Sequence, residues 1–171
     1  MAYDLRKALE YAVEVEKEGM RAYMDFALRS TSVDGKNMFI WLAREEYSHM
    51  RLFESMLHTV LGGEIPVAEE VPPATVLKFM PRLKKMERAD GGSADAHDTD
   101  ALRAALKMER ETRDYYRQQA QAAEDPEVAK VFDALADVEQ GHFELIQAQL
   151  DYVTQTGFWF GEMEFTVEGR M

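Results

Sequence analysis

The sequence contains no cysteine among its 171 residues. A chain without cysteine cannot form a disulfide, a thiolate zinc site, an iron–sulfur cluster or a rubredoxin-type iron site. Any transition metal must therefore be bound by histidine and carboxylate side chains alone.

Long apolar runs and excess positive charge are absent as well. No run approaches the roughly 20 apolar residues that a helix needs to cross a bilayer, and residues 1–7 lack the hydrophobic region of a signal peptide. We therefore expect a cytoplasmic protein that does not bind a membrane. The net charge of −12 argues against a nucleic acid or an anionic membrane as the main partner.

The chain contains an internal repeat. One ungapped offset aligns residues of the first half with identical residues of the second half: Glu16 with Glu109, Tyr23 with Tyr116, Phe39 with Phe132, Glu46 with Glu139, and His49 with His142. Apolar residues recur at helical spacing in both halves. The sequence therefore predicts an all-α fold in which a pair of helices occurs twice.

Helix-breaking residues divide the chain into segments. Residues 30–35 separate the first two helices, and Asp125 with Pro126 starts the last helix as N-cap and first helical residue. Asp98 or Thr99 is the expected N-cap of the third helix. The prediction is a single domain, 1–171, with these parts: hairpin one at about 3–61, a long crossover at about 62–98 with a short helical piece at 76–86, hairpin two at about 99–153, and an aromatic tail at 154–171 that packs against the bundle or a neighbouring subunit.

Each predicted core stripe is interrupted near its middle by a glutamate, and two stripes carry a histidine one turn later. The residues are Glu16, Glu46, His49, Glu109, Glu139 and His142. Residues at i and i+3 share a helix face, so each Glu-x-x-His presents a carboxylate and an imidazole together. A buried unpaired carboxylate is costly, whereas two divalent cations would balance four glutamates and two neutral histidines. The alternative is that the glutamates lie at the stripe edges and extend to solvent.

Oxygen and imidazole ligands without sulfur suit iron or manganese, and zinc can also bind them. Each metal would take one histidine and one terminal glutamate, with two glutamates bridging. The sequence thus predicts a dinuclear site with two iron ions, for which manganese or zinc are possible substitutes.

Four segments carry a resemblance to a known family. They are 15–23, 42–49, 108–116 and 135–142, and they resemble the rubrerythrin-like branch of the ferritin-like superfamily. The resemblance implies a ferritin-like four-helix bundle with a long crossover between helices two and three. It also implies that the six glutamates and histidines are the ligands, and that Tyr23 and Tyr116 lie beside the site. The other interpretation of these tyrosines is that they are bulky core aromatics.

The sequence departs from rubrerythrins at two points. It cannot make their rubredoxin-like domain, and Thr112 occupies the position of an additional family glutamate, so the ligand set is closer to bacterioferritin-type sites. The resemblance implies reduction of peroxide. Without a rubredoxin-like domain, the electrons must come from an external donor protein, and we expect a homodimer or a higher homo-oligomer. Two alternatives remain open: a ferroxidase or iron-handling protein that uses O2 or peroxide, and a non-catalytic metal-binding module.

Overall fold

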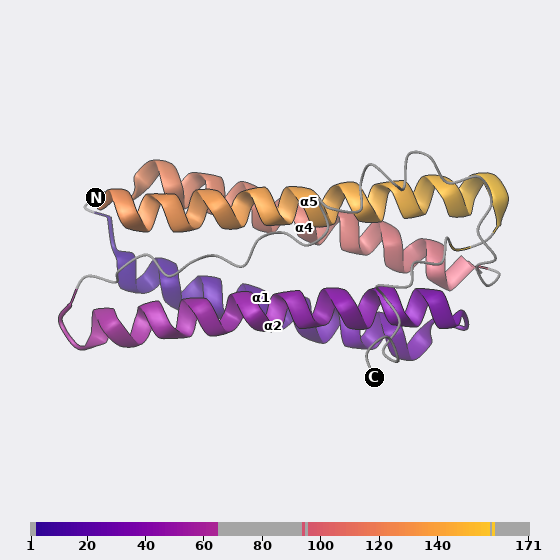
Figure 1. Ribbon diagram of the computed structural model, residues 1–171, viewed down its shortest axis with the longest axis horizontal. Coiled ribbons are helices and arrows are strands. Elements are labelled where there is room, and N and C mark those ends of the chain that lie inside the picture. Colours follow the sequence, from indigo (N-terminus) through magenta and orange to yellow (C-terminus); the bar gives the residue numbers. More distant parts are fainter. Residues whose placement is uncertain (1–2, 65–93, 95, 158, 160–171) are drawn as a thin grey trace, which may run out of the picture.

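A computed structural model describes residues 3–64, 94, 96–157 and 159. These residues form the helices α1 (Leu5–Arg29), α2 (Val33–Leu61), α4 (Ala96–Ala122) and α5 (Pro126–Thr156). Helix α1 packs against α2, α4 packs against α5, and the two hairpins lie side by side (Figure 1). The predicted four-helix bundle of two hairpins is confirmed. The helical piece predicted at 76–86 lies outside the described residues.

The starts of two helices follow the N-cap chemistry of the sequence. Asp125 accepts hydrogen bonds from the backbone of Glu127 and Val128, and α5 begins at Pro126 as predicted. Ser32 caps α2 by accepting from the backbone nitrogen of Gly35. Helix α2 therefore begins at Val33, inside the segment that was predicted to separate the helices. A serine N-cap satisfies one of the free backbone N–H groups of the first turn, so the break needs fewer residues than expected.

The predicted N-cap of the third helix is wrong. Helix α4 begins at Ala96, so Asp98 lies in its first turn, where it is buried. There it accepts a hydrogen bond from the indole nitrogen of Trp159, at 3.1 Å. The Asp98 carboxylate thus binds a residue distant in sequence instead of capping the helix. A local capping pattern in the sequence cannot reveal such a contact.

The end of α5 also differs from the prediction. The helix runs to Thr156, and Gly157 closes it in the left-handed conformation, with φ 77°. Glycine adopts this conformation without the steric penalty that a Cβ brings. The aromatic tail was expected to start at 154, but its first residues are the last turn of α5.

Trp159 attaches the tail to the bundle. Its side chain is fully buried and meets the ring of Phe39 edge to face, with centroids 5.7 Å apart. A Cβ added to Gly35 would lie 2.7 Å from two atoms of the indole, so only glycine leaves room for the ring. For Trp159 the prediction that the tail packs against the bundle is confirmed. The other tail aromatics, Phe158, Phe160 and Phe165, lie outside the described residues.

The core consists of two apolar clusters. One is centred on Tyr23, Phe39, Leu42, Leu102 and Ile146, and the other on Leu9, Phe53, Tyr116, Phe132 and Leu135. The glutamates and histidines of the predicted site lie between them in sequence on every helix. Burial of each large apolar side chain contributes about 1.5–3 kcal/mol, and this stabilisation offsets the cost of burying a polar layer. No helix within the described ranges is long and apolar enough to cross a membrane.

Candidate metal centre

All six predicted ligand residues lie inside the bundle. Their exposed fractions range from 0% to 4%. The set comprises one glutamate from α1, one from α4, and a Glu-x-x-His pair from each of α2 and α5: Glu16, Glu109, Glu46 with His49, and Glu139 with His142. The alternative in which the glutamates extend to solvent is therefore excluded.

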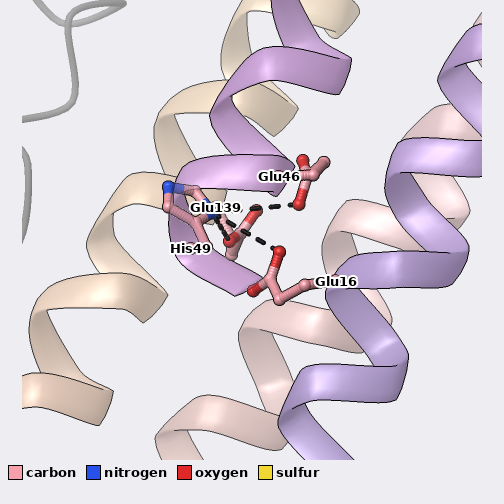
Figure 2. Close-up of side chains that lie close together, drawn as sticks. All are labelled: Glu16, Glu46, His49 and Glu139. Atoms are coloured by element: carbon pink, nitrogen blue, oxygen red, sulfur yellow. Dashed lines mark ion pairs between the residues drawn. The ribbon is translucent and has the colours of Figure 1, made fainter. Parts of the chain in front are cut away.

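One half of the site consists of Glu16, Glu46, His49 and Glu139. Each offers one ligand atom, and these atoms all lie within 4.8 Å of one another. Nδ1 of His49 lies 3.5 Å from Oε2 of Glu16 and 3.2 Å from Oε1 of Glu139. Figure 2 shows the three carboxyl groups turned toward one another, with the His49 ring beside them.

The other half consists of Glu46, Glu109, Glu139 and His142, again with one ligand atom each within 4.8 Å of the others. Nδ1 of His142 lies 3.2 Å from Oε2 of Glu139, 3.5 Å from Oε1 of Glu46 and 3.6 Å from Oε2 of Glu109. The His49 and His142 rings stack with centroids 5.7 Å apart. The two halves therefore repeat the same arrangement, as the sequence repeat predicts.

Glu46 and Glu139 belong to both halves. Each has two carboxylate oxygens, so each can place one oxygen toward either cation position. Glu16 with His49 and Glu109 with His142 belong to one half only. This is the connectivity of a dinuclear centre with two bridging and two terminal carboxylates.

The donor atoms fit such a centre because several are buried without a hydrogen bond. They include Oε2 of Glu16, Oε1 of Glu46, Nδ1 of His49 and Oε1 of Glu139. A buried polar atom without a partner costs about 1–3 kcal/mol. Divalent cations with a preference for oxygen and imidazole would satisfy all four atoms at once.

Without metal, burial and mutual interactions shift the pKa values of the ligand residues. Burial, and the charges of Glu46 and Glu139 respectively, raise the pKa of Glu16 and of Glu109 well above the usual value. Burial opposes ionisation of Glu46 and Glu139 too, but the adjacent Glu16 carboxyl and the two imidazoles lower the pKa of Glu46, and the two imidazoles lower that of Glu139.

The histidines complete this balance. Burial alone would lower the pKa of each imidazole, but the surrounding carboxylates raise the pKa of His49 and of His142 well above the usual value. The shifts therefore favour protons on Glu16, Glu109 and the two histidines, and ionised carboxylates at Glu46 and Glu139.

A tyrosine holds each terminal glutamate. The Tyr116 hydroxyl donates to Oε1 of Glu16, and the Tyr23 hydroxyl donates to Oε1 of Glu109. Burial raises the pKa of both phenols well above the usual value, so they stay neutral donors. In each terminal glutamate the Oε2 atom is left facing the centre. The structure thus places both predicted tyrosines beside the site, although their part in a reaction stays a prediction.

Comparison with known proteins supports the same assignment. The family model described as Rubrerythrin matches residues 7–96 and 100–156. The chain belongs to the rubrerythrin family. Comparison with curated proteins and with solved structures gave no match. Rubrerythrin-family proteins usually bind iron, and the family match together with the buried cluster indicates a di-iron site.

A cavity beside the centre was not predicted from the sequence. It has a volume of about 450 Å³ and lies between α1 and α4, where its lining includes Gly19, Thr112, Tyr11 and Tyr115. Gly19 and Thr112 occupy equivalent positions in the repeat. A Cβ added to Gly19 would lie 3.5 Å from Oε2 of Glu46, so Gly19 lies between the cavity and the centre. In this rubrerythrin-family chain, the missing family glutamate and the glycine both leave space on this side.

Proposed function

We propose that this chain reduces hydrogen peroxide at a dinuclear iron centre, with electrons from an external donor. The observation that carries the proposal is the sharing of Glu46 and Glu139 between two ligand groups that each contain their own histidine. Such sharing supports two adjacent metal ions rather than one. A pair of metals can hold both oxygen atoms of peroxide.

In this reaction the six ligand residues would position the two iron ions and balance their charge. Glu16 with His49 and Glu109 with His142 would hold the two ions as terminal ligands, while Glu46 and Glu139 bridge them. Four carboxylates and two neutral imidazoles balance two divalent cations. When bound in reduced form, the iron pair supplies the two electrons needed to cleave the O–O bond of peroxide.

Tyr23 and Tyr116 would orient the terminal glutamates. Each phenol occupies one oxygen of its glutamate, which leaves the second oxygen for a metal. Mutation of a residue that hydrogen-bonds to a metal ligand typically lowers metal affinity or activity about 10–100-fold. The two hydroxyls would act in this way, by fixing the orientation in which each terminal carboxylate binds its metal. The cavity next to Gly19 would give a small oxidant access to the centre from between α1 and α4.

Electrons would come from outside this chain, because it has no cysteine with which to hold a rubredoxin-type iron. A reduced donor protein is the expected partner.

Oxidation of ferrous iron as a substrate is the second candidate function. It is favoured by Thr112, because the lack of a glutamate there leaves the six-residue ligand set that resembles bacterioferritin-type sites. In that case the cavity would serve the passage of iron as well as oxidant.

Stopped-flow absorbance of the ferrous protein mixed with peroxide or with O2 tests the proposal. We expect about one peroxide consumed per pair of iron ions, faster than O2, and renewed turnover only after a reduced donor is added. Glu109→Gln should lose most of this reaction, whereas Asp100→Asn, at an exposed carboxylate of α4 outside the cavity, should keep it. Faster oxidation by O2 with release or storage of added iron would favour ferroxidase activity instead. Absence of reaction with either oxidant would leave a non-catalytic metal module.

A further inference from the structure

A row of three tyrosines connects the metal centre with the protein surface. Tyr116 is buried and donates its hydroxyl to Glu16. Its ring centroid lies 5.7 Å from that of Tyr115, and the Tyr115 centroid lies 4.8 Å from that of Tyr11. Tyr11 is 57% exposed. The rings are thus within contact distance from a candidate ligand to solvent.

The other half of the bundle has no equivalent row in the part of the chain that the structure describes. Tyr23 is the repeat partner of Tyr116, but the partner of Tyr115 is Ala22. The rings beside Tyr23 are Phe26 and Phe39, and beyond Phe39 stands the buried Trp159. Phenylalanine is much harder to oxidise than tyrosine. The repeat therefore produces one tyrosine beside each terminal glutamate, but only one of them continues to the surface.

The outer end of the row lies where a small molecule can reach it. Tyr11 and Tyr115 both line the cavity between α1 and α4. Three glutamates line that cavity, and each has a basic partner: Glu14 pairs with Lys17, Glu18 with Arg21, and Glu111 with Lys107. Tyr115 is held in place by a hydrogen bond from its hydroxyl to the carbonyl oxygen of Ala8, at 3.0 Å.

We propose that Tyr11, Tyr115 and Tyr116 form a path for single electrons between the surface and the Glu16 side of the centre, an inference that rests on the proposed redox function. Reduction of peroxide to two waters takes two electrons and two protons. When the centre lacks one of these two electrons, Tyr11 supplies it. The electron passes inward through Tyr115 and Tyr116, and the phenolic proton of Tyr11 goes to water. A one-electron reductant of the ascorbate or thiol class then returns an electron and a proton to the Tyr11 phenoxyl radical.

The test begins with metal-free protein, so that it does not depend on peroxide chemistry. Since the chain has no cysteine, Glu14→Cys creates a single attachment point, one turn from Tyr11, for a photo-oxidant such as a ruthenium complex. A flash removes one electron from Tyr11, and the phenoxyl absorption is followed while ascorbate is added. We expect most of the radical to resist ascorbate at least tenfold longer than in the same protein with Tyr115→Phe, because the radical moves to buried Tyr116. The phenolic proton of Tyr116 then passes along its hydrogen bond to Oε1 of Glu16. Equal lifetimes in the two proteins would refute the path.

The second part uses the iron-loaded protein and peroxide in excess over reducing electrons. A spin trap added during the reaction should become attached to Tyr11, as located by peptide mass spectrometry. Tyr115→Phe and Tyr11→Phe should each reduce labelling at residue 11 at least tenfold, and Tyr47→Phe, at an exposed tyrosine of α2, should leave it unchanged. Tyr11 is exposed, so its replacement is compatible with folding. Labelling that persists in Tyr115→Phe contradicts the path. Failure of the protein to consume peroxide contradicts the proposed function, and the flash experiment then decides the path by itself.

Discussion

Metal binding should release protons in a number that follows from the metal-free site. Glu16, Glu109, His49 and His142 have raised pKa values, which favour their protonated forms in the metal-free site. A ligand must give up its proton before it binds a metal. Occupation of both positions by Zn²⁺, which has no redox chemistry, should therefore release about four protons per chain, or about two per ion.

The affinity of the centre for metal should also depend on pH. Because each raised pKa favours the protonated, metal-free state, affinity should increase with pH as long as pH is below these pKa values. Release of two protons per ion corresponds to an increase of about a hundredfold in apparent affinity per pH unit.

A pH-stat titration of metal-free protein with Zn²⁺ measures the protons directly. Glu109→Gln should release about one proton fewer, while the exposed Glu111→Gln should match the unmodified protein. Release of fewer than about one proton per chain at saturation would refute the proton assignment, because it would mean that the site is already deprotonated when metal arrives.

Three further outcomes concern stability. Chelation should lower the melting temperature by about 5–10 °C per site lost. A ligand at a hundred times its Kd stabilises the folded state by about 2.7 kcal/mol, and each kcal/mol corresponds to about 2–4 °C for a chain of this size. An unchanged melting curve after confirmed metal loss would contradict an inward-facing cluster. Metal-free protein should lose stability as pH rises from neutral through the raised pKa values of Glu16, Glu109 and the two histidines. The reason is that the folded state then loses protons that it binds more tightly than the unfolded chain does. Thermal melts in a pH series check this, and a melting temperature that rises with pH would contradict it. Trp159→Ala should cost about 3–5 kcal/mol in urea unfolding, since a buried indole and its bond to Asp98 are lost; a cost below about 1 kcal/mol would mean that the tail does not stabilise the bundle.

The sequence repeat allowed much of the centre to be predicted. Glu16 and Glu109 are repeat partners with raised pKa values, and Glu46 and Glu139 are repeat partners with lowered ones. Helical spacing places each glutamate in the core stripe, so the position of the cluster could be inferred from one-dimensional periodicity.

The features that were missed depend on contacts across helices. The start of α4 could not be located because Asp98 is held by Trp159, which is remote in sequence. The tyrosine row was missed because Tyr11 and Tyr115 lie outside the core stripes, on different helices, and their contact appears only when α1 packs beside α4. The cavity at Gly19 likewise requires both helices.

The central claim is that Glu46 and Glu139 bridge two metal ions. Mössbauer spectroscopy of the protein reconstituted with iron and then oxidised, combined with elemental analysis, tests it most directly. We predict two iron ions per chain whose spins are coupled to a diamagnetic ground state, since bridging ligands bring the ions about 3.5–4 Å apart. Glu139→Ala should lose the coupling. One iron ion per chain, or two with uncoupled paramagnetic spectra, would contradict a dinuclear centre.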